Sequence, residues 1–267
     1  MKYILLLLLI SFTGQIFSQE TVNQTDANGL RQGLWKKNYP NGKLIYQGQF
    51  SDGKPVGIWK RYHDNGKKQA DIIYSEVSDS ADTKLYDEAG KLIAEGIFLN
   101  EQKVGVWKYF SNNRIVAEDE FLHGLKNGLS RKFYQTGEVF EEAEWKNNLK
   151  EGKYKAYFKN GKPYMECIYK YNLRDGFCIT YFENGRMELE AFYSNDLRHN
   201  NWNYYSESGE LLYTLKYNLN QLLNSSMLDS IQSNQLNEMD GNKGKILDPA
   251  EFLNNPSEYM IRNRMNR

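Results

Sequence analysis

The sequence contains little cysteine, little proline and no excess of either charge. Two cysteines in 267 residues exclude a small fold held together by many disulfides. With 5 prolines against 20 tyrosines and 13 phenylalanines, the composition favours strands over disordered segments. The 34 Lys and Arg residues balance 34 Asp and Glu residues, so the chain lacks the basic excess that is typical of nucleic-acid-binding proteins. We therefore expect no nucleic acid among its partners.

Sequence motifs of catalytic and metal sites are also missing. The chain has no Gly-x-Ser-x-Gly elbow, no phosphate-binding loop and no His-Glu-x-x-His pattern. Its 3 histidines are His63, His123 and His199, which fall in turns and links at opposite edges of the sheet predicted below. A metal site needs convergent ligands. We expect no catalytic residues, no cofactor and no metal.

The one long hydrophobic run lies at the N-terminus. Lys2 precedes a run of leucines that ends at Ile10, and small and polar residues follow. This order is typical of a secretory signal peptide over residues 1–18, cleaved near Ser18, and the run is short for a membrane span. An uncleaved anchor helix is the alternative, and it would be the one membrane attachment we expect. The mature protein is predicted to be exported, to the periplasm or beyond, where disulfides can form.

A repeat of about 24 residues fills residues 33–223. Position 1 of the eight repeats is occupied by Gly33, Gly57, Ala81, Gly105, Gly128, Gly152, Gly176 and Asn200. Position 18 is aromatic in every repeat, and position 10 is a glycine except in the shorter fourth repeat, where it is Asn113. Both glycine and asparagine tolerate the positive φ of a tight turn. The pattern therefore places one turn in the middle of each repeat.

Two short runs flank each turn, and this predicts a β-hairpin per repeat. Joined hairpins give an all-β fold, an antiparallel meander of about sixteen strands that strand twist curls into a ribbon or half-pipe. Residues 19–32 are predicted as a polar lead-in and residues 224–247 as a linker. Residues 248–267 are predicted as a C-terminal tail with a short helix from Pro256 to about Met265.

The repeats also predict the strand register. Position 16 of one repeat pairs with position 3 of the next, and the pairs are Gly48 with Trp59, Ile72 with Thr83, Gly96 with Trp107, Asp119 with Ser130, Ala143 with Tyr154, Cys167 with Cys178, and Ala191 with Trp202. Wherever position 3 carries a large ring its partner is Gly or Ala, as close packing requires. The same register places each position-18 ring opposite the next opening residue, as in Trp145 with Gly152.

The opposite face of the predicted sheet carries a ladder of charges. The register pairs Asp71 with Lys84, Glu95 with Lys108, Glu118 with Arg131, and Glu142 with Lys155. Opposite charges across strands stabilise a sheet modestly. Regular repetition favours a structural ladder over acid–base catalysis.

The repeat unit resembles that of a known family. The unit Gly-x-Trp-Lys-x-Tyr-x-x-Asn-Gly-Lys, seen from Gly57 and echoed from Gly152, resembles the MORN repeat variant and the repeats of bacterial YwqK-type antitoxins. The resemblance implies a β-hairpin ribbon without known catalytic residues and with an interaction role. For some members it implies neutralisation of a toxin. The signal peptide and the C-terminal tail are additions to that pattern.

Two groups of residues are candidate sites. Cys167 and Cys178 form either a disulfide or a pair of small buried thiols that replaces a lost ring. The aromatic residues at position 6 share the charged face and are candidates for facing a partner, and they are Tyr62, Tyr86, Phe110, Phe133, Tyr157, Tyr181 and Tyr205. The rings at positions 3 and 18 are instead expected to pack on the sheet.

The function predicted from the sequence is that of an exported, non-catalytic scaffold that binds a protein partner along the ribbon. The alternative is an antitoxin or immunity-type protein that neutralises a toxin. An envelope hydrolase would need a nucleophile and base that the sequence does not display. A lipid-surface binder would lack polybasic attraction, because the net charge is zero.

Overall fold

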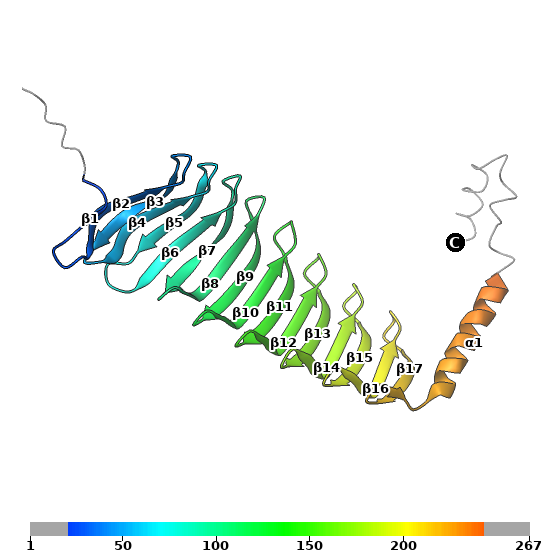
Figure 1. The fold of residues 1–267 in the computed structure, drawn as a ribbon. Coiled ribbons are helices and arrows are strands. Elements are labelled where there is room, and N and C mark those ends of the chain that lie inside the picture. Colours follow the sequence, from blue (N-terminus) through cyan, green and yellow to red (C-terminus); the bar gives the residue numbers. More distant parts are fainter. Residues whose placement is uncertain (1–20, 243–267) are drawn as a thin grey trace, which may run out of the picture. The chain divides into compact units, whose positions relative to one another are not determined.

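The computed structural model describes residues 21–242. They form two compact units, of which unit 1 ends at Glu101 and unit 2 begins at Gln102. Within each unit, every strand pairs antiparallel with the next strand along the chain (Figure 1). The predicted all-β antiparallel meander is thereby confirmed. The described residues contain 18 strands because a two-residue strand flanks the array at either end.

Unit 1 contains seven of the strands. They are β1 (Gln24–Thr25), β2 (Arg31–Asn38), β3 (Leu44–Ser51), β4 (Lys54–Tyr62), β5 (Lys68–Tyr74), β6 (Ser80–Tyr86) and β7 (Leu92–Leu99). The first of these lies in the stretch predicted as a polar lead-in, and β2 also starts there. Composition does not reveal this strand, because a tertiary contact holds it in place. Trp35 Nε1 donates a hydrogen bond to the backbone oxygen of Gln24 at 3.2 Å.

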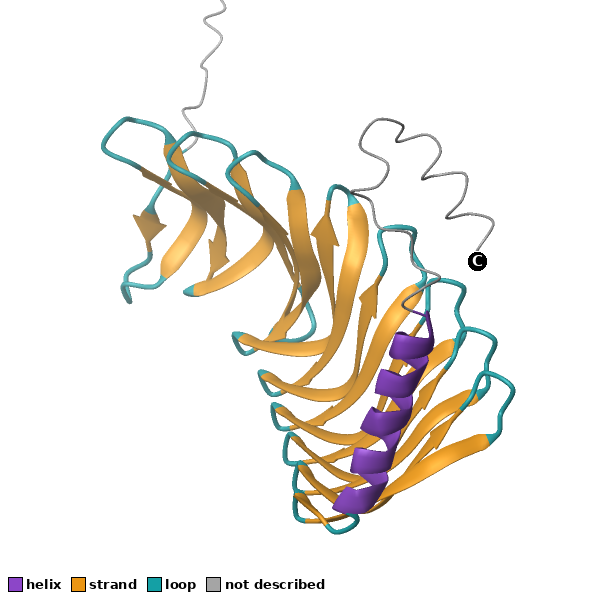
Figure 2. Cartoon of the chain, turned by 90° about the vertical axis from the view of Figure 1, so that its right-hand side faces the viewer, coloured by secondary structure: helices purple, strands orange, loops and turns teal. Residues whose placement is uncertain are grey.

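Unit 2 contains eleven strands and one helix. The strands are β8 (Gln102–Ser111), β9 (Arg114–Leu122), β10 (Leu125–Phe133), β11 (Val139–Lys146), β12 (Leu149–Tyr157), β13 (Pro163–Lys170), β14 (Leu173–Tyr181), β15 (Met187–Ser194), β16 (Leu197–Tyr205), β17 (Leu211–Asn218) and β18 (Gln221–Leu222). Helix α1 (Ser225–Asn242) follows the last strand. Figure 2 shows the strands as curved ribbons, in keeping with the twist expected of antiparallel sheets.

Helix α1 corrects the prediction of a linker over residues 224–247. Asn224 fastens the start of the helix to β17, because its Oδ1 accepts from the backbone nitrogen of Lys216 at 2.8 Å and its Nδ2 donates to the Thr214 oxygen at 2.9 Å. Ile231 packs against a buried cluster that includes Trp202 and Leu215. These tertiary contacts stabilise a helix that the polar composition did not indicate. The helix predicted from Pro256 lies outside the described residues.

Membrane-spanning helices were sought in the same part of the chain. Nowhere between residues 21 and 242 is a helix both long and apolar enough to cross a bilayer.

The predicted register is correct at the centre of the strands. Ile72 lies opposite Thr83, Ala143 opposite Tyr154, and Cys167 opposite Cys178. Gly48 lies beneath the indole ring of Trp59, where a Cβ atom would overlap the ring. In the fifth repeat, position 3 is Ser130 in place of an aromatic residue, and a polar pair fills the space. Ser130 Oγ donates a hydrogen bond to Asp119 Oδ1 at 2.6 Å. Volume compensation between neighbouring repeats therefore determines the core.

The predicted pairing of position 18 with the next opening residue is wrong in most repeats. Trp145 lies opposite Lys150 and not opposite Gly152, because a bulge interrupts the register between Ala143 and Trp145. Gly152 occupies this bulge with a φ of 115°, a conformation that favours glycine. Its space is filled by Glu144, whose Oε2 accepts from the backbone nitrogen of Lys153 at 2.9 Å.

Hydrogen bonds also fasten both edges of each sheet from repeat to repeat. At the turn edge, Asn184 Nδ2 donates to the backbone oxygen of Glu207 at 3.1 Å, and Asn65 does the same to Glu88 at 2.9 Å. At the other edge, the backbone nitrogen of Lys150 donates to Asn172 Oδ1 at 2.7 Å. Each repeat is thus held chiefly by its neighbours, as in other repeat arrays.

Candidate interaction surface

Each unit has one face that serves as its core, which we call the aromatic face. It carries repeat positions 3, 16 and 18, since alternate residues of a strand point to the same side. Trp59, Trp107 and Trp202 are all buried at position 3, and Ala143 and Ala191 are buried at position 16. Rings at positions 3 and 18 contact one another, as Trp202 and Tyr217 do with centroids 5.4 Å apart.

In six repeats a cation lies over the position-18 ring. The cation belongs to the residue two before position 1 of the same repeat. The bulge pairs this residue with position 18 of the preceding repeat, as Lys150 with Trp145, and its side chain lies over the position-18 ring of its own repeat. The pairs, with the distance to the ring centroid, are Arg31 over Phe50 (5.0 Å), Lys103 over Phe121 (5.0 Å), Lys126 over Trp145 (4.9 Å), Lys150 over Tyr169 (5.3 Å), Arg174 over Tyr193 (3.9 Å) and Arg198 over Tyr217 (4.4 Å). Such contacts stabilise the aromatic face, because the stems and charged ends of the basic side chains cover its rings.

The sequence analysis missed this series of cations, although the basic residue recurs at a fixed offset and could have been found. Burial on the aromatic face also shifts the pKa of several of its titratable groups. Burial lowers the pKa of Lys103, which lies over Trp107 and Phe121. Burial likewise raises the pKa of Tyr154 and Tyr204 to about 12.

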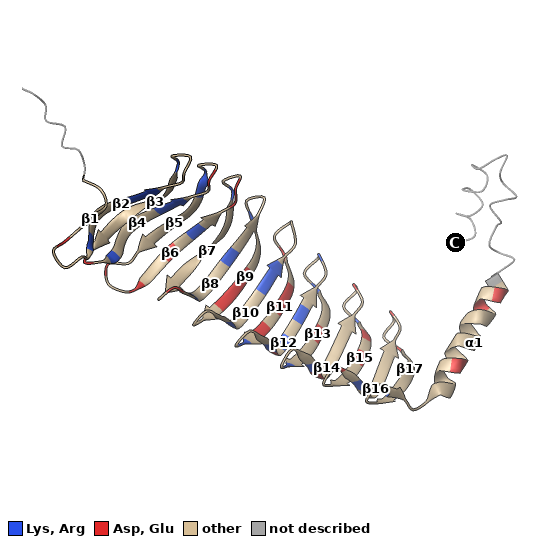
Figure 3. Cartoon of the chain, viewed as in Figure 1, with Lys and Arg blue, Asp and Glu red and all other residues tan. Residues whose placement is uncertain are grey.

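The opposite face of each unit, the ladder face, carries the charged residues of positions 4 and 15. Basic and acidic residues occur on neighbouring strands of unit 2 (Figure 3). The register pairs Glu142 with Lys155 as predicted, but the shorter ion pairs join partners within one repeat. Arg131 Nε lies 2.8 Å from Glu142 Oε1, and Lys155 Nζ lies 2.8 Å from Glu166 Oε1.

The position-6 aromatic residues are half-buried on this ladder and do not project freely. The hydroxyl of Tyr157 donates to Glu142 at 2.9 Å, and that of Tyr86 donates to Asp71 at 3.0 Å. Tyr181 makes a longer bond of the same kind to Glu166. Burial and then the carboxylate raise the pKa of Tyr157. Their polar ends therefore bind the preceding repeat. Tyr62, Phe110, Phe133 and Tyr205 are half-buried as well.

Several large apolar residues are exposed on the ladder face at positions 2 and 17, which we call the apolar stripe. In unit 1, Ile58 and Ile73 face each other across strands and are 60% and 50% exposed. In unit 2, Phe177 is 55% exposed and contacts Phe192 edge-on at 5.2 Å. The last repeat carries the polar pair Asn201 and Lys216 at the same two positions. The stripe is therefore a feature of particular repeats and not a requirement of the fold.

The third repeat departs from the pattern on the aromatic face. Ala81 replaces the opening glycine without positive φ, so the register continues without a bulge from Ile72 to Tyr74. Thr83 replaces the ring of position 3, and Asp79 replaces the cation. The chain from Ser75 to Asp79 forms a longer connection. Beside it lies a cavity of about 920 Å³, lined among others by Ile72, Tyr74, Asp79, Thr83 and Phe98.

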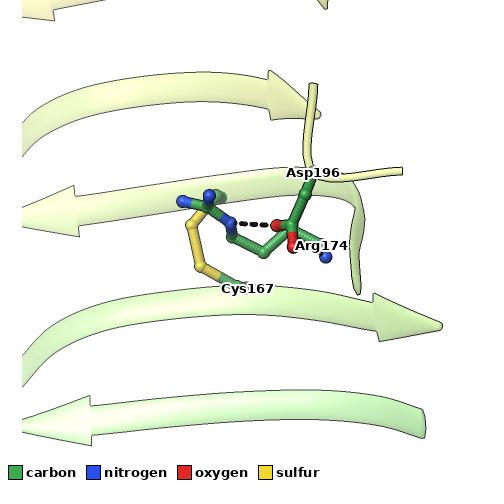
Figure 4. Close-up of a disulfide and its surroundings, with 4 residues drawn as sticks. Cys167, Arg174 and Asp196 are labelled. Atoms are coloured by element: carbon green, nitrogen blue, oxygen red, sulfur yellow. Dashed lines mark hydrogen bonds and ion pairs between the residues drawn. A yellow bond between two sulfur atoms is a disulfide. The ribbon is translucent and has the colours of Figure 1, made fainter. Parts of the chain in front are cut away.

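The two cysteines occupy positions 16 and 3 on the aromatic face of unit 2. Their sulfur atoms are bonded in the structure, and their Cα atoms are 4.1 Å apart (Figure 4). Both residues are buried. Nearby, Arg174 Nε donates to Asp196 Oδ1 at 2.6 Å, as the dashed line in Figure 4 shows. The pair fills a ring position of the core.

Groups of His, Cys, Asp and Glu side chains suited to a metal ion were sought among residues 21–242, and none was found there. The predicted absence of a metal, a cofactor and catalytic residues stays a prediction for the whole chain.

Comparison with known proteins identifies the repeat. Residues 31–52, 55–76, 126–147 and 150–171 match the MORN repeat variant, and residues 142–153 match the MORN repeat. Each of the four longer matches spans one hairpin, such as β2 with β3. The chain therefore carries MORN-type repeats. No curated protein is similar in sequence to the chain.

Solved structures give only distant similarity. The crystal structure of an S. aureus TarM mutant in complex with Fondaparinux, alpha-GlcNAc-glycerol and UDP is 14% identical, with a TM-score of 0.17 over 53% of this chain and 20% of that one. The crystal structure of TcdB2-TccC3-TEV is 12% identical, with a TM-score of 0.19 over 73% of this chain and 12% of that one. The chain thus spans a small part of both proteins, and neither similarity bears on its function.

Proposed function

We propose that this protein is an exported, non-catalytic repeat scaffold that binds a protein partner along the apolar stripe of its ladder face. The observation that carries the proposal is the exposure of paired, large apolar side chains at positions 2 and 17. Phe177 and Phe192 stand where the last repeat has Asn201 and Lys216. Because the fold accepts polar residues there, the apolar pair is best explained by an interaction.

The rest of the chemistry supports the same proposal. Cations of the aromatic face bind rings of their own array, and carboxylates of the ladder bind the bases and hydroxyls of adjacent strands. MORN-type repeats are commonly interaction repeats. Side chains that already make such contacts are not free to act as catalytic acids or bases, and this favours a binding role over a hydrolase.

A matched double variant tests the proposal. Phe177→Asn with Phe192→Lys copies the polar pair of the last repeat, so we expect it to fold and melt like the wild type. In affinity capture from the native envelope, the wild type should retain a partner that the double variant loses. A partner retained equally by both proteins would contradict binding through the stripe.

A toxin is the more specific alternative for the partner, suggested by the resemblance of the repeats to YwqK-type antitoxins. If it is correct, co-expression should rescue growth from a toxin encoded beside the gene, and the double variant should not. Export is tested separately by the mass of the protein from the cell envelope. A mature N-terminus at Gln19 supports cleavage after Ser18, and an intact Met1 contradicts it.

A further inference from the structure

We propose that a cavity on the ladder face of unit 2 binds a tyrosine side chain of a protein partner, whose hydroxyl donates a hydrogen bond to Glu118. The proposal rests on the proposed function, since it names the chemistry of a partner at a second place on the same face. The cavity has a volume of about 800 Å³, and its lining includes Phe110, Glu118 and Phe133. A cavity of this size accepts one aromatic side chain together with its flanking backbone.

The other repeats show what Glu118 lacks. A position-15 carboxylate accepts a hydrogen bond from the position-6 tyrosine of the next repeat in three cases, which are Asp71 with Tyr86, Glu142 with Tyr157, and Glu166 with Tyr181. Glu118 holds position 15 of the fourth repeat, but the fifth repeat carries Phe133 at position 6 and so brings no hydroxyl. Within residues 21–242 no other group donates a hydrogen bond to Glu118 in its place. Its oxygens are therefore open to a donor from a ligand.

The charges around Glu118 decide which kind of donor fits. The register places Glu118 between Lys108 on β8 and Arg131 on β10, and neither base lies within ion-pair distance of it. Arg131 instead pairs with Glu142 at 2.8 Å, and Arg114 is a further base in the lining of the cavity. Three bases thus stand against two carboxylates. A neutral O–H donor meets the open acceptor without adding charge, whereas a Lys or Arg of a partner would be repelled.

The walls of the cavity favour an aromatic ligand. Phe110 pairs with Ile115 across strands, and Phe133 pairs with Val139. All four side chains line the cavity and are half-buried. The two rings lie on strands to either side of the one that carries Glu118, so a ligand ring can pack against them while its hydroxyl reaches the carboxylate. The short side chains of Ser and Thr would leave these rings uncovered.

The missing residue of the fourth repeat opens the cavity at the turn edge. The turn between β8 and β9 consists of Asn112 and Asn113, which both adopt a positive φ. Arg114 follows this turn, and its Nη1 donates a hydrogen bond to the backbone oxygen of Gln135 in the next turn. The chain from Gln135 to Gly137 lines the cavity on that side. A partner segment can therefore enter between the two turns.

The probe is the blocked tripeptide acetyl-Thr-Tyr-Phe-amide, which copies residues 180–182 and carries no charge. We expect saturation-transfer NMR and chemical-shift titration to detect its binding to the full mature protein. Replacing its Tyr by Phe should weaken the binding at least about tenfold, since the peptide loses a hydrogen bond to a carboxylate. Equal binding of the two peptides would overturn the proposal.

Two small compounds separate a protein segment from other ligands. p-Cresol carries the same phenol without a backbone, and maltose carries hydroxyl groups on rings that pack against aromatic side chains. Binding of p-cresol as tightly as the tyrosine peptide would assign the cavity to a small phenol. Tighter binding of maltose would assign it to a carbohydrate. Either result would overturn the proposal.

Phe133→Tyr supplies the missing hydroxyl from within the chain. It should weaken the tyrosine peptide at least about tenfold, because the new hydroxyl occupies the place of the ligand's. The melting temperature should not fall, since Tyr157 stands at this position beside Glu142 in the next repeat. Phe158→Tyr is the matched control. It adds a hydroxyl outside the cavity at position 7, where Tyr134 stands in the fifth repeat, and it should bind both peptides like the wild type.

Glu118→Ala removes the acceptor and should bind the tyrosine and phenylalanine peptides equally. The proposal is overturned if this variant still prefers the tyrosine peptide, if Phe133→Tyr binds that peptide as tightly as the wild type, or if the wild type does not bind it. None of these results touches the outcome with the Phe177→Asn, Phe192→Lys variant, on which the proposed function depends.

Discussion

Gly48 shows at the scale of one residue how large rings are accommodated on the aromatic face of the sheet. The indole of Trp59 lies on the glycine, and a Cβ atom there would enter the ring. Gly48→Ala should lower the free energy of unfolding by about 1–3 kcal/mol through overpacking. Urea denaturation measures the change. Gly241→Ala is the matched control, because this helical glycine has open space around it and the substitution should be neutral or slightly stabilising.

Glu142 links two repeats and makes stability depend on pH. Burial alone would raise its pKa, but hydrogen bonds from Arg131 and Tyr157 outweigh that effect and lower the pKa. A lowered pKa in the folded state stabilises the protein above the pKa of an unfolded Glu, and this contribution is lost as the pH falls through the folded value. Glu142→Gln should therefore cost about 0.5–1 kcal/mol at pH 7, and this cost should shrink as the pH is lowered to about 3.

Chemical denaturation between these two pH values tests the claim about Glu142. Glu210→Gln, at an exposed position after the last turn, should behave like the wild type at every pH. A deficit of Glu142→Gln that persists unchanged in acid would show that the substitution acts through packing and not through the charge.

The bond between Cys167 and Cys178 should contribute to the stability of unit 2. Reduction should lower the free energy of unfolding by about 2–3 kcal/mol, because it frees the chain between two residues 11 apart in sequence. Melting with and without dithiothreitol measures this. A Cys167→Ala, Cys178→Ala protein should not respond to the reductant. Two free thiols by alkylation and mass measurement of protein from its native compartment would contradict the disulfide.

At the scale of one element, the bulge at position 1 lies where one hairpin pairs with the preceding one. Gly152→Ala should cost about 1–3 kcal/mol, because alanine must adopt a φ of 115° and displace the carboxylate of Glu144. Asn200 occupies the same position with a φ of 58°, so Asn200→Gly should be neutral or stabilising. Thermal unfolding compares the two variants. Equal stability of Gly152→Ala and the wild type would rule out this account of the bulge.

The hairpins could be predicted from the sequence because every repeat carries the same two local constraints. Position 10 holds a turn residue, and the paired positions 16 and 3 hold side chains of complementary volume. Turn geometry and side-chain volume act between residues close in sequence, as between Ala143 and Tyr154. The bulge at Gly152 could not be placed the same way, because a glycine in a strand is compatible with both regular pairing and a bulge. Helix α1 was missed for another reason, since its stability comes from Ile231 and Asn224 contacting β17.

The candidate surface was predicted only in part. Position 6 was correctly placed on the charged face, but its hydroxyls bind carboxylates such as Glu142. The more exposed apolar residues, Ile58 and Phe177, belong to position 2. Across the repeats, position 2 holds both apolar and polar residues, so the periodicity of the sequence did not identify Ile58 and Phe177 as exposed apolar residues. The cavity beside Asp79 follows from three substitutions in one repeat that only the structure brings together.

For the molecule as a whole, the repeats direct most of their polar and aromatic chemistry at their neighbours. Edge hydrogen bonds, stacked cations and the charge ladder all join adjacent strands. An array of this kind needs no central core and no catalytic group to remain folded. What distinguishes one repeat from another is the set of side chains that these contacts leave exposed, and the apolar stripe is one such difference on the ladder face.

Site-specific photo-crosslinking tests that account most directly. A benzoylphenylalanine placed at residue 177 occupies the stripe, and one placed at residue 201 occupies the same repeat position where the chain is polar. In the native envelope, we predict that irradiation joins a protein partner to residue 177 and not to residue 201. Crosslinking of the same partner from both residues, or from residue 201 alone, would contradict the claim that the apolar stripe is the binding surface.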